Sequence, residues 1–266
     1  MKHINGAIGE IYKIDEAASR DKWLNNVHPL AKLIVTIYYI ATVVSFDRYD
    51  IAGLLGMVIY PVVLFIVGEI NFLTGICRMK LVFPVICFIG VLNPVFDREI
   101  LFYVEGFAVT TGLISMVTLM IKGVLTVLSA YLLIATTTIE KICFALRMIH
   151  IPKVIVTIIM LIYRYIVLLM QEVDRLSQAY SLRAPKQKGI NIKAWGPFVG
   201  QLVLRSMDRA EAVYESMSLR GFNGEIASAN LKKFNGSSAI YMLVCVGLIT
   251  LFRWVPVSMA IGNILM

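Results

Sequence analysis

Two arginines, Arg183 and Arg220, stand where two long predicted helices end. Each follows a leucine and precedes a small residue, in Leu182-Arg183-Ala184 and in Leu219-Arg220-Gly221. A guanidinium is a planar group with several N–H donors, and an adjacent leucine adds apolar contact, so such an end suits insertion into a groove on another protein. A single arginine there could simply complement the helix dipole. Two copies that close consecutive helices favour a mechanical coupling element that docks a soluble partner.

The helices that carry these ends are predicted over 154–183 and 197–220. Pro185 ends the first, while Pro197 opens the second and Gly221 ends it. With a rise of about 1.5 Å per residue, the two helices would be about 45 Å and about 35 Å long. They would be long, stiff elements.

Both helices contain an Asp-Arg pair followed by a tyrosine. The tyrosine comes six residues after the aspartate in Asp174 to Tyr180 and in Asp208 to Tyr214. This spacing indicates a weak internal repeat of an arginine-ended helix. A shorter helix is expected before the repeat, from about 138 to near His150.

The composition places these helices in a membrane protein. Of 266 residues, 59% are hydrophobic and 16% are charged, and the mean hydropathy is +0.79. This mixture is too apolar for a soluble globule or a disordered chain. The first 29 residues are polar and lack the apolar core of a signal peptide, so we expect none. The net charge of +8 is interpreted as the Lys and Arg excess of cytoplasmic loops, and not as a nucleic-acid surface.

Hydropathy and the distribution of charge together predict five membrane spans of roughly 20 residues each. They are expected at 30–46, 51–68, 81–96, 107–135 and 239–266. A sixth apolar run, 154–170, has Arg164 at its centre, and hydropathy alone would favour it as a sixth span.

The distribution of charge argues against that sixth span. With a cytoplasmic N-terminus, the loops alternate in charge as the positive-inside rule requires. Segment 171–238 holds ten Lys and Arg residues and would face outward if 154–170 crossed. We therefore expect 154–170 to be an apolar helix buried against the other helices.

The sequence predicts an all-α integral membrane protein with about five transmembrane helices. A cytoplasmic helical coupling block lies between the fourth and fifth spans. The expected parts are an N-terminal segment with four spans over 1–135, the coupling helices over 136–238, and the final span over 239–266.

Two other cations in apolar surroundings, Lys122 and Arg164, are interpreted as structural charges. Lys122 is expected to face a helix interior or to extend to the membrane surface. Arg164 is expected to pair with a carboxylate or with carbonyls of the coupling block. No Asp or Glu lies within the apolar runs, so a proton relay is not indicated.

The sequence offers little enzyme chemistry. The histidines His3, His28 and His150 share no metal-ligand spacing, so no metal site is predicted. No phosphate-binding G-x-x-x-x-G-K-[ST] loop is present, so ATP must bind elsewhere. No nucleophile and base stand together, so no catalytic residues are assigned and the chain is not expected to be an enzyme by itself.

Several segments of the sequence resemble those of a known family. The chain is similar to the transmembrane T component of energy-coupling-factor (ECF) transporters, most of all to the cobalt-uptake branch. The resemblance covers nearly the whole chain. Its residues are 204–222 (LRSMDRAEAVYESMSLRGF), 14–18 (IDEAA), 28–33 (HPLAKL), 136–138 (TTT) and 163–165 (YRY).

The resemblance implies a role as a coupling subunit. In that family the T component holds two ATP-binding-cassette (ABC) ATPases beneath it and a small substrate-binding membrane protein beside it. Each family coupling helix ends in an Ala-Arg-Gly-like triplet that seats in an ATPase groove. Here Leu182-Arg183-Ala184 departs from that triplet at its first and third positions, and Leu219-Arg220-Gly221 at its first. The central arginine is kept in both.

The resemblance also implies the setting. The chain would lie in a bacterial or archaeal cell membrane as a multi-pass protein, with ATP bound by the partner subunits and no cofactor of its own. Cobalt is the expected substrate, with nickel and a vitamin as alternatives.

Two other functions are compatible with a membrane protein. A self-sufficient secondary transporter or channel would use Lys122, Arg164 and Arg253 along a path, but the inverted repeats and broken helices of such transporters are not visible. A lipid-modifying membrane enzyme would need paired carboxylates or clustered histidines, which the sequence does not show.

Overall fold

The computed structural model is largely helical and falls into two compact units. It describes residues 23–70, 72–80, 82–96, 100–104, 107–185, 189–224 and 236–254, together with Gly9, Asp15, Glu16, Ala18, Ser19 and Gln187. One unit lies within 17–138 and 232–266, and the other within 1–16 and 139–231.

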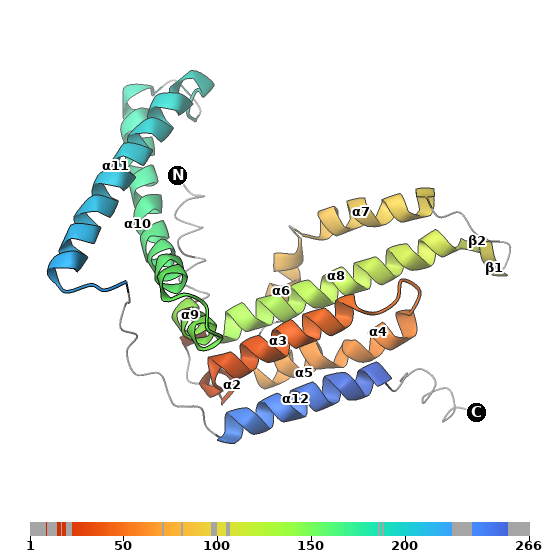
Figure 1. Cartoon of the computed structure of the whole chain (residues 1–266). Helices are drawn as coiled ribbons and strands as arrows, with labels where there is room; N and C mark the ends of the chain where they lie inside the picture. The colour runs from red at the N-terminus through yellow and green to blue at the C-terminus, as the bar shows by residue number, and fades with distance from the viewer. Residues whose placement is uncertain are drawn as a thin grey trace. The chain divides into compact units, whose positions relative to one another are not determined.

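The first unit is a bundle built around one long helix, α8 (Figure 1). Helices α3 to α7 pack on α8, and α12 packs on α3 and α4. The elements are α2 (Trp23–Asn26), α3 (Pro29–Val44), α4 (Ile51–Met57), α5 (Ile59–Val67), α6 (Phe72–Met79), α7 (Phe83–Phe96), β1 (Ile100–Val104), β2 (Phe107–Thr110), α8 (Thr111–Thr136) and α12 (Gly236–Trp254).

The core of this bundle follows the helical period of α3. Ala31, Val35, Tyr39 and Val43 recur every fourth residue and are all fully buried. The Tyr39 hydroxyl donates to the Met57 carbonyl oxygen at 2.9 Å. Four residues after Met57 stands Pro61, which has no N–H to donate to that carbonyl. Tyr39 therefore satisfies a carbonyl at the break between α4 and α5.

Three described helices are long and apolar enough to cross a membrane, namely α8, α10 (Lys153–Arg183) and α12. Shorter apolar helices lie over Pro29–Val44, Ile51–Val67 and Phe83–Pro94. The chain is therefore a multi-pass membrane protein. The expected span 51–68 is interrupted at Val58, between α4 and α5.

The expected span 107–135 needs correction at its start. Residues 107–110 form β2 instead of helix, and they pair antiparallel with β1. This short hairpin is not part of the all-helical expectation. Its β-branched and aromatic residues favour a strand. Helix α8 begins only at Thr111, and residues 255–266 of the last expected span lie outside the described residues.

Buried polar contacts join helix ends in this bundle. Lys32, only 3% exposed, donates from Nζ to the Thr136 carbonyl oxygen at 2.9 Å, at the end of α8. The His28 N–H donates to Ser238 Oγ near the start of α12 at 3.1 Å. His28 Nδ1 accepts the Leu30 N–H at 3.3 Å and so caps α3. Burial lowers the pKa of His28, which keeps Nδ1 unprotonated and able to accept.

The second unit contains α9 (Ile139–Met148), α10 and α11 (Ile192–Leu219), with α10 packed on both of the others. The predicted helices over 138–150 and 154–183 agree with α9 and α10. The predicted start of the last helix at Pro197 is wrong. The Asn191 side chain accepts the Lys193 N–H at 3.1 Å and caps the helix, so α11 begins earlier and Pro197 lies within it.

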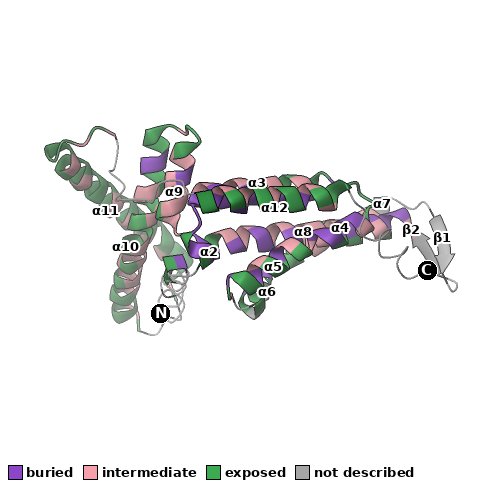
Figure 2. Ribbon diagram, turned by 90° about the horizontal axis from the view of Figure 1, so that it is seen from below, coloured by how far each residue is buried: buried purple, intermediate pink, exposed green. Residues whose placement is uncertain are grey.

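Within its own unit, the apolar run 154–170 is mostly exposed or only partly buried. In α10 only Val156 and Thr157 are buried, whereas Ile155 and Ile162 are 48% and 59% exposed. Figure 2 shows α10 and α11 coloured mostly as exposed or intermediate. The two other helices of the unit leave the apolar face of α10 uncovered, and a face of this kind needs a cover of lipid or protein.

Candidate coupling site

The end of α10 presents Arg183 without needing a glycine. The Ala184 N–H donates to the Tyr180 carbonyl oxygen at 3.0 Å, and Ala184 has φ −130°. A negative φ does not require glycine, and Pro185 prevents the helix from continuing. The backbone at the third position of this triplet therefore does not require glycine, and alanine can stand there.

The end of α11 does require its glycine. The Gly221 N–H donates to Ser218 O and the Phe222 N–H to Met217 O, both at 3.0 Å. Gly221 has φ +78°, in the left-handed region that glycine adopts without cost. This pair of bonds is a Schellman motif. It fixes Arg220 as the last residue before the chain turns away.

Both triplets project from the surface of the unit. Leu182 is 82% exposed and Leu219 is 90% exposed. In the described part of the chain, no hydrogen bond or ion pair involves the guanidinium of Arg183 or of Arg220. The two arginines thus do not bond the last carbonyls of their own helices, and each places a charged donor group beside an exposed apolar side chain.

Tyr180 orders the connection between the two helices. Its hydroxyl donates to Gln187 Oε1 at 2.7 Å and accepts the Asn191 N–H at 3.3 Å. Tyr214 holds the equivalent place in the internal repeat but is 66% exposed. The repeat therefore describes how the helices end and does not extend to the tyrosine contacts.

Lys122 and Arg253 both bind carbonyls around the end of α3. Lys122 Nζ donates to Phe46 O at 2.5 Å. The Arg253 guanidinium donates to Ser45 O at 3.2 Å and lies 4.4 Å from the centre of the Phe46 ring. Cations near the C-terminal end of a helix complement its dipole, and these two cations stabilise that end of α3.

Arg164 is placed differently from the expectation. Its side chain is exposed on α10, and among the described residues it has no carboxylate or carbonyl partner. It lies in the second unit, whereas Lys122 and Arg253 lie in the first.

The sequence did not indicate the contacts of three residues, namely Lys32, Glu172 and Arg205. Lys32 had a detectable signal, because a cation in the first turns of a helix opposes the dipole and needs another reason to be there. Glu172 and Arg205 are 33 residues apart on different helices and form an ion pair. No local pattern connects them.

Comparison with known proteins gives the family. The profile of the CbiQ family, described as cobalt transport protein, matches residues 20–230. The chain belongs to this family. It is also 32% identical over 118 residues to an uncharacterized protein of Methanocaldococcus jannaschii. That match covers 43% of this chain and 40% of the relative, so it spans less than half of either protein.

Membership in the CbiQ family and the apolar helices together make the chain a membrane component of a transport family. Among the described residues, no three His, Cys, Asp or Glu side chains are grouped so that they could hold a metal ion. His28 and His150 belong to different units, and His3 lies outside the described residues.

The glycine at the second helix end gives a testable prediction. Gly221→Ala forces a Cβ into the left-handed region, which costs roughly 1 kcal/mol, although no other atom lies within 4 Å of that Cβ. We expect amide hydrogen exchange over 217–222 to become about fivefold faster, measured by mass spectrometry.

Two companion variants make this test specific. Gly221→Asn should recover part of the protection, because asparagine tolerates the left-handed conformation. Ala184→Gly, at the end that needs no glycine, should have little effect on 217–222. Unchanged exchange in Gly221→Ala would show that the Schellman motif does not hold Arg220.

Proposed function

We propose that the chain is the energy-coupling T component of an ECF-type importer. Two ABC ATPase subunits dock on Leu182-Arg183-Ala184 and on Leu219-Arg220-Gly221, and a small membrane subunit binds the substrate. The observation that carries this proposal is the pair of exposed arginines, engaged with no described residue, that close consecutive long helices of one compact unit. The chain itself is non-catalytic, and ATP is bound by the partner subunits.

The helices suit the transmission of force. Helices α10 and α11 have 31 and 28 residues, which corresponds to about 46 and about 42 Å. Each is continuous, so a displacement of its arginine end by an ATPase would move the whole rod. Tyr180 ties the connection between the rods through its contacts with Gln187 and Asn191.

The exposed apolar face of α10 supports a membrane partner beside the chain. Ile155, Ile158 and Ile162 lie on this face at 48%, 49% and 59% exposure, and a face of this kind is covered by another protein or by lipid.

We place residues 136–238 on the cytoplasmic side, with five spans and a cytoplasmic N-terminus, in a bacterial or archaeal cell membrane. The basic charge of 171–238 supports this orientation.

Cobalt is the proposed substrate because of the CbiQ family. The substrate-binding subunit, and not this chain, would supply the metal ligands. A nickel or vitamin importer would use the same coupling helices with a different substrate-binding subunit, so the identity of that subunit decides among the three.

Flux measurements distinguish this function from a self-sufficient transporter. Liposomes that contain the purified chain alone should take up neither Co²⁺ nor Ni²⁺. Liposomes that contain the complex purified with its ATPases should take up the substrate only when ATP is supplied. Metal uptake by the chain alone would support the secondary transporter. The contacts of Lys122 and Arg253 with carbonyls around the end of α3 favour the coupling role, because those contacts give both cations a structural use.

A further inference from the structure

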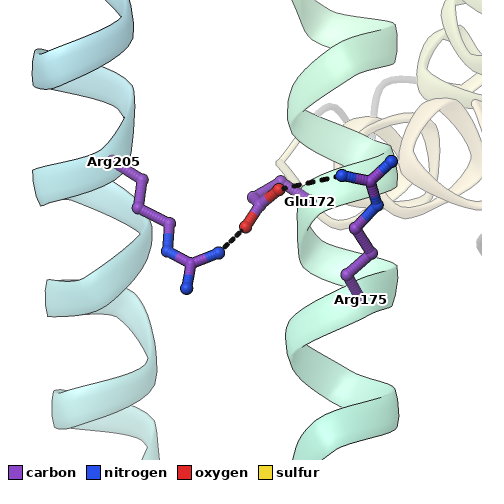
Figure 3. Close-up of polar contacts among 3 residues, drawn as sticks. All are labelled: Glu172, Arg175 and Arg205. Atoms are coloured by element: carbon purple, nitrogen blue, oxygen red, sulfur yellow. Dashed lines mark hydrogen bonds and ion pairs between the residues drawn. The ribbon is translucent and has the colours of Figure 1, made fainter.

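An ion pair connects the two arginine-ended helices away from their ends. Glu172 of α10 accepts from the Arg205 guanidinium of α11 (Figure 3). Glu172 also lies 4.0 Å from Arg175, one helical turn along α10. The Glu172 side chain is 22% exposed, compared with 49% for Arg205 and 77% for Arg175. One shielded carboxylate therefore serves two guanidinium groups.

The partial burial of Glu172 makes this pair more than a solvated surface contact. Exposed ion pairs contribute little to stability, because water and salt screen them. A charge-assisted hydrogen bond to a shielded carboxylate is screened less and is more directional. Arg175 places a second positive charge near the same carboxylate.

The position of the pair along the helices gives it mechanical significance. Glu172 lies eleven residues before Arg183 on α10, and Arg205 lies fifteen residues before Arg220 on α11. We call the stretches 172–183 and 205–220 the arms of the two helices, and their lengths are about 17 Å and about 22 Å. Figure 1 shows α10 and α11 crossing each other, with the chain connection beyond the crossing. The ion pair therefore joins the two helices at a distance from both arginine ends.

The other described contacts between the two helices are a shallow apolar stripe and polar contacts near the ends of the pair. Helix α11 has no fully buried residue. Its partly buried side chains are Ala194, Phe198, Leu202, Ser206, Val213 and Met217, which form a shallow stripe. Tyr180 restrains the end where the chain passes from one helix to the other. At the opposite end, Thr157 Oγ1 of α10 donates to the Gly224 carbonyl oxygen, four residues after Arg220, at 3.2 Å. A shallow apolar contact tolerates rotation, whereas an ion pair with a hydrogen bond specifies one relative position.

We propose that Glu172 and Arg205 are positioning residues that form the pivot between the two coupling helices. The ion pair fixes the angle between the helices and so holds Arg183 and Arg220 at a defined separation, so that movement imposed on one helix turns the other with it. This proposal rests on the proposed coupling function for its consequence in transport. Its structural part, a fixed separation of the two helix ends, can be tested without any partner.

The structural part is tested by the distance between spin labels on the two arms. Ser181→Cys and Ser218→Cys place labels at exposed positions next to the arginines, in a chain whose four native cysteines are replaced by alanine. We expect a narrow distance distribution in lipid nanodiscs. Glu172→Gln and Arg205→Gln should each broaden it, and the double variant should broaden it no further, because either change removes the same contact.

Two controls separate the pivot from a general loss of packing. Arg175→Gln removes the longer and more exposed contact of Glu172, so the distance distribution should stay narrow. Arg205→Lys keeps a positive donor and should restore part of the order. A distribution that stays equally narrow in Glu172→Gln, in a sample of unchanged melting temperature, would overturn the pivot.

The functional part is tested in the complex with its ATPases. Glu172→Gln leaves both docking arginines in place, so the ATPases should still co-purify. The number of substrate ions imported per ATP hydrolysed should fall about fivefold, since each cycle would be partly lost in rotation of the helices. An unchanged ratio would overturn the pivot but not the coupling function. Failure of the unaltered chain to bind any ATPase would overturn the coupling function and leave the spin-label result standing.

Discussion

Arg183→Glu together with Arg220→Glu is expected to abolish co-purification of the ABC ATPases while the chain still inserts into the membrane. Both guanidinium groups lack partners among the described residues, so their loss should not disturb the fold. A carboxylate in their place would remove the donors and reverse the charge presented to the ATPase groove. We expect each single variant to weaken ATPase binding by roughly a hundredfold.

The matched control is Arg209→Glu, which makes the same charge change at an exposed position within α11. The ATPases should still accompany this variant. The readout is the ATPase recovered per membrane-inserted chain after affinity purification in detergent. Full recovery with the double variant would mean that the two helix ends are ordinary capped termini.

Lys32→Met is expected to lower the stability of the membrane bundle by about 2 kcal/mol. Lys32 donates to the Thr136 carbonyl oxygen at 2.9 Å and to Thr137 Oγ1 at 3.4 Å. Thr136 is itself only 4% exposed, so methionine would leave a buried carbonyl at the end of α8 without this donor. The melting temperature of the purified chain should fall by roughly 5 °C.

The control for this variant is Lys193→Met, which makes the same change at an exposed position of α11 and should alter the melting temperature by little. Lys32→Glu should be more destabilising than Lys32→Met, because a buried carboxylate would face carbonyl oxygens. Equal melting temperatures for Lys32→Met and the unaltered chain would show that Lys32 does not anchor the end of α8.

The sequence was sufficient to predict the helices of the coupling unit. Proline marked the end of α10 and glycine the end of α11, because each imposes a backbone requirement that few residues share. The start of α11 was misplaced, because Asn191 offered a stronger cap than the signal at Pro197. The short hairpin before α8 was missed, because its apolar strand β2 could not be told from the start of an apolar helix.

The residues of the candidate site could be predicted from the sequence, but the partners of the charged side chains could not. The two arginine triplets stand at helix ends, which local sequence specifies. The partners of Lys122, Lys32 and Glu172 come from distant parts of the chain, and no local rule selects them. What covers 154–170 is likewise not predictable from the sequence, because hydropathy shows that a helix must be covered and does not show what covers it.

The central claim is most directly tested by affinity purification of the unaltered chain from detergent-solubilised membranes, followed by mass spectrometry of the proteins that accompany it. We predict two ABC ATPase subunits and one small membrane subunit, whose identity would name the substrate. If the chain is recovered without an ATPase and moves ions in liposomes without ATP, the coupling function is contradicted and the transporter takes its place.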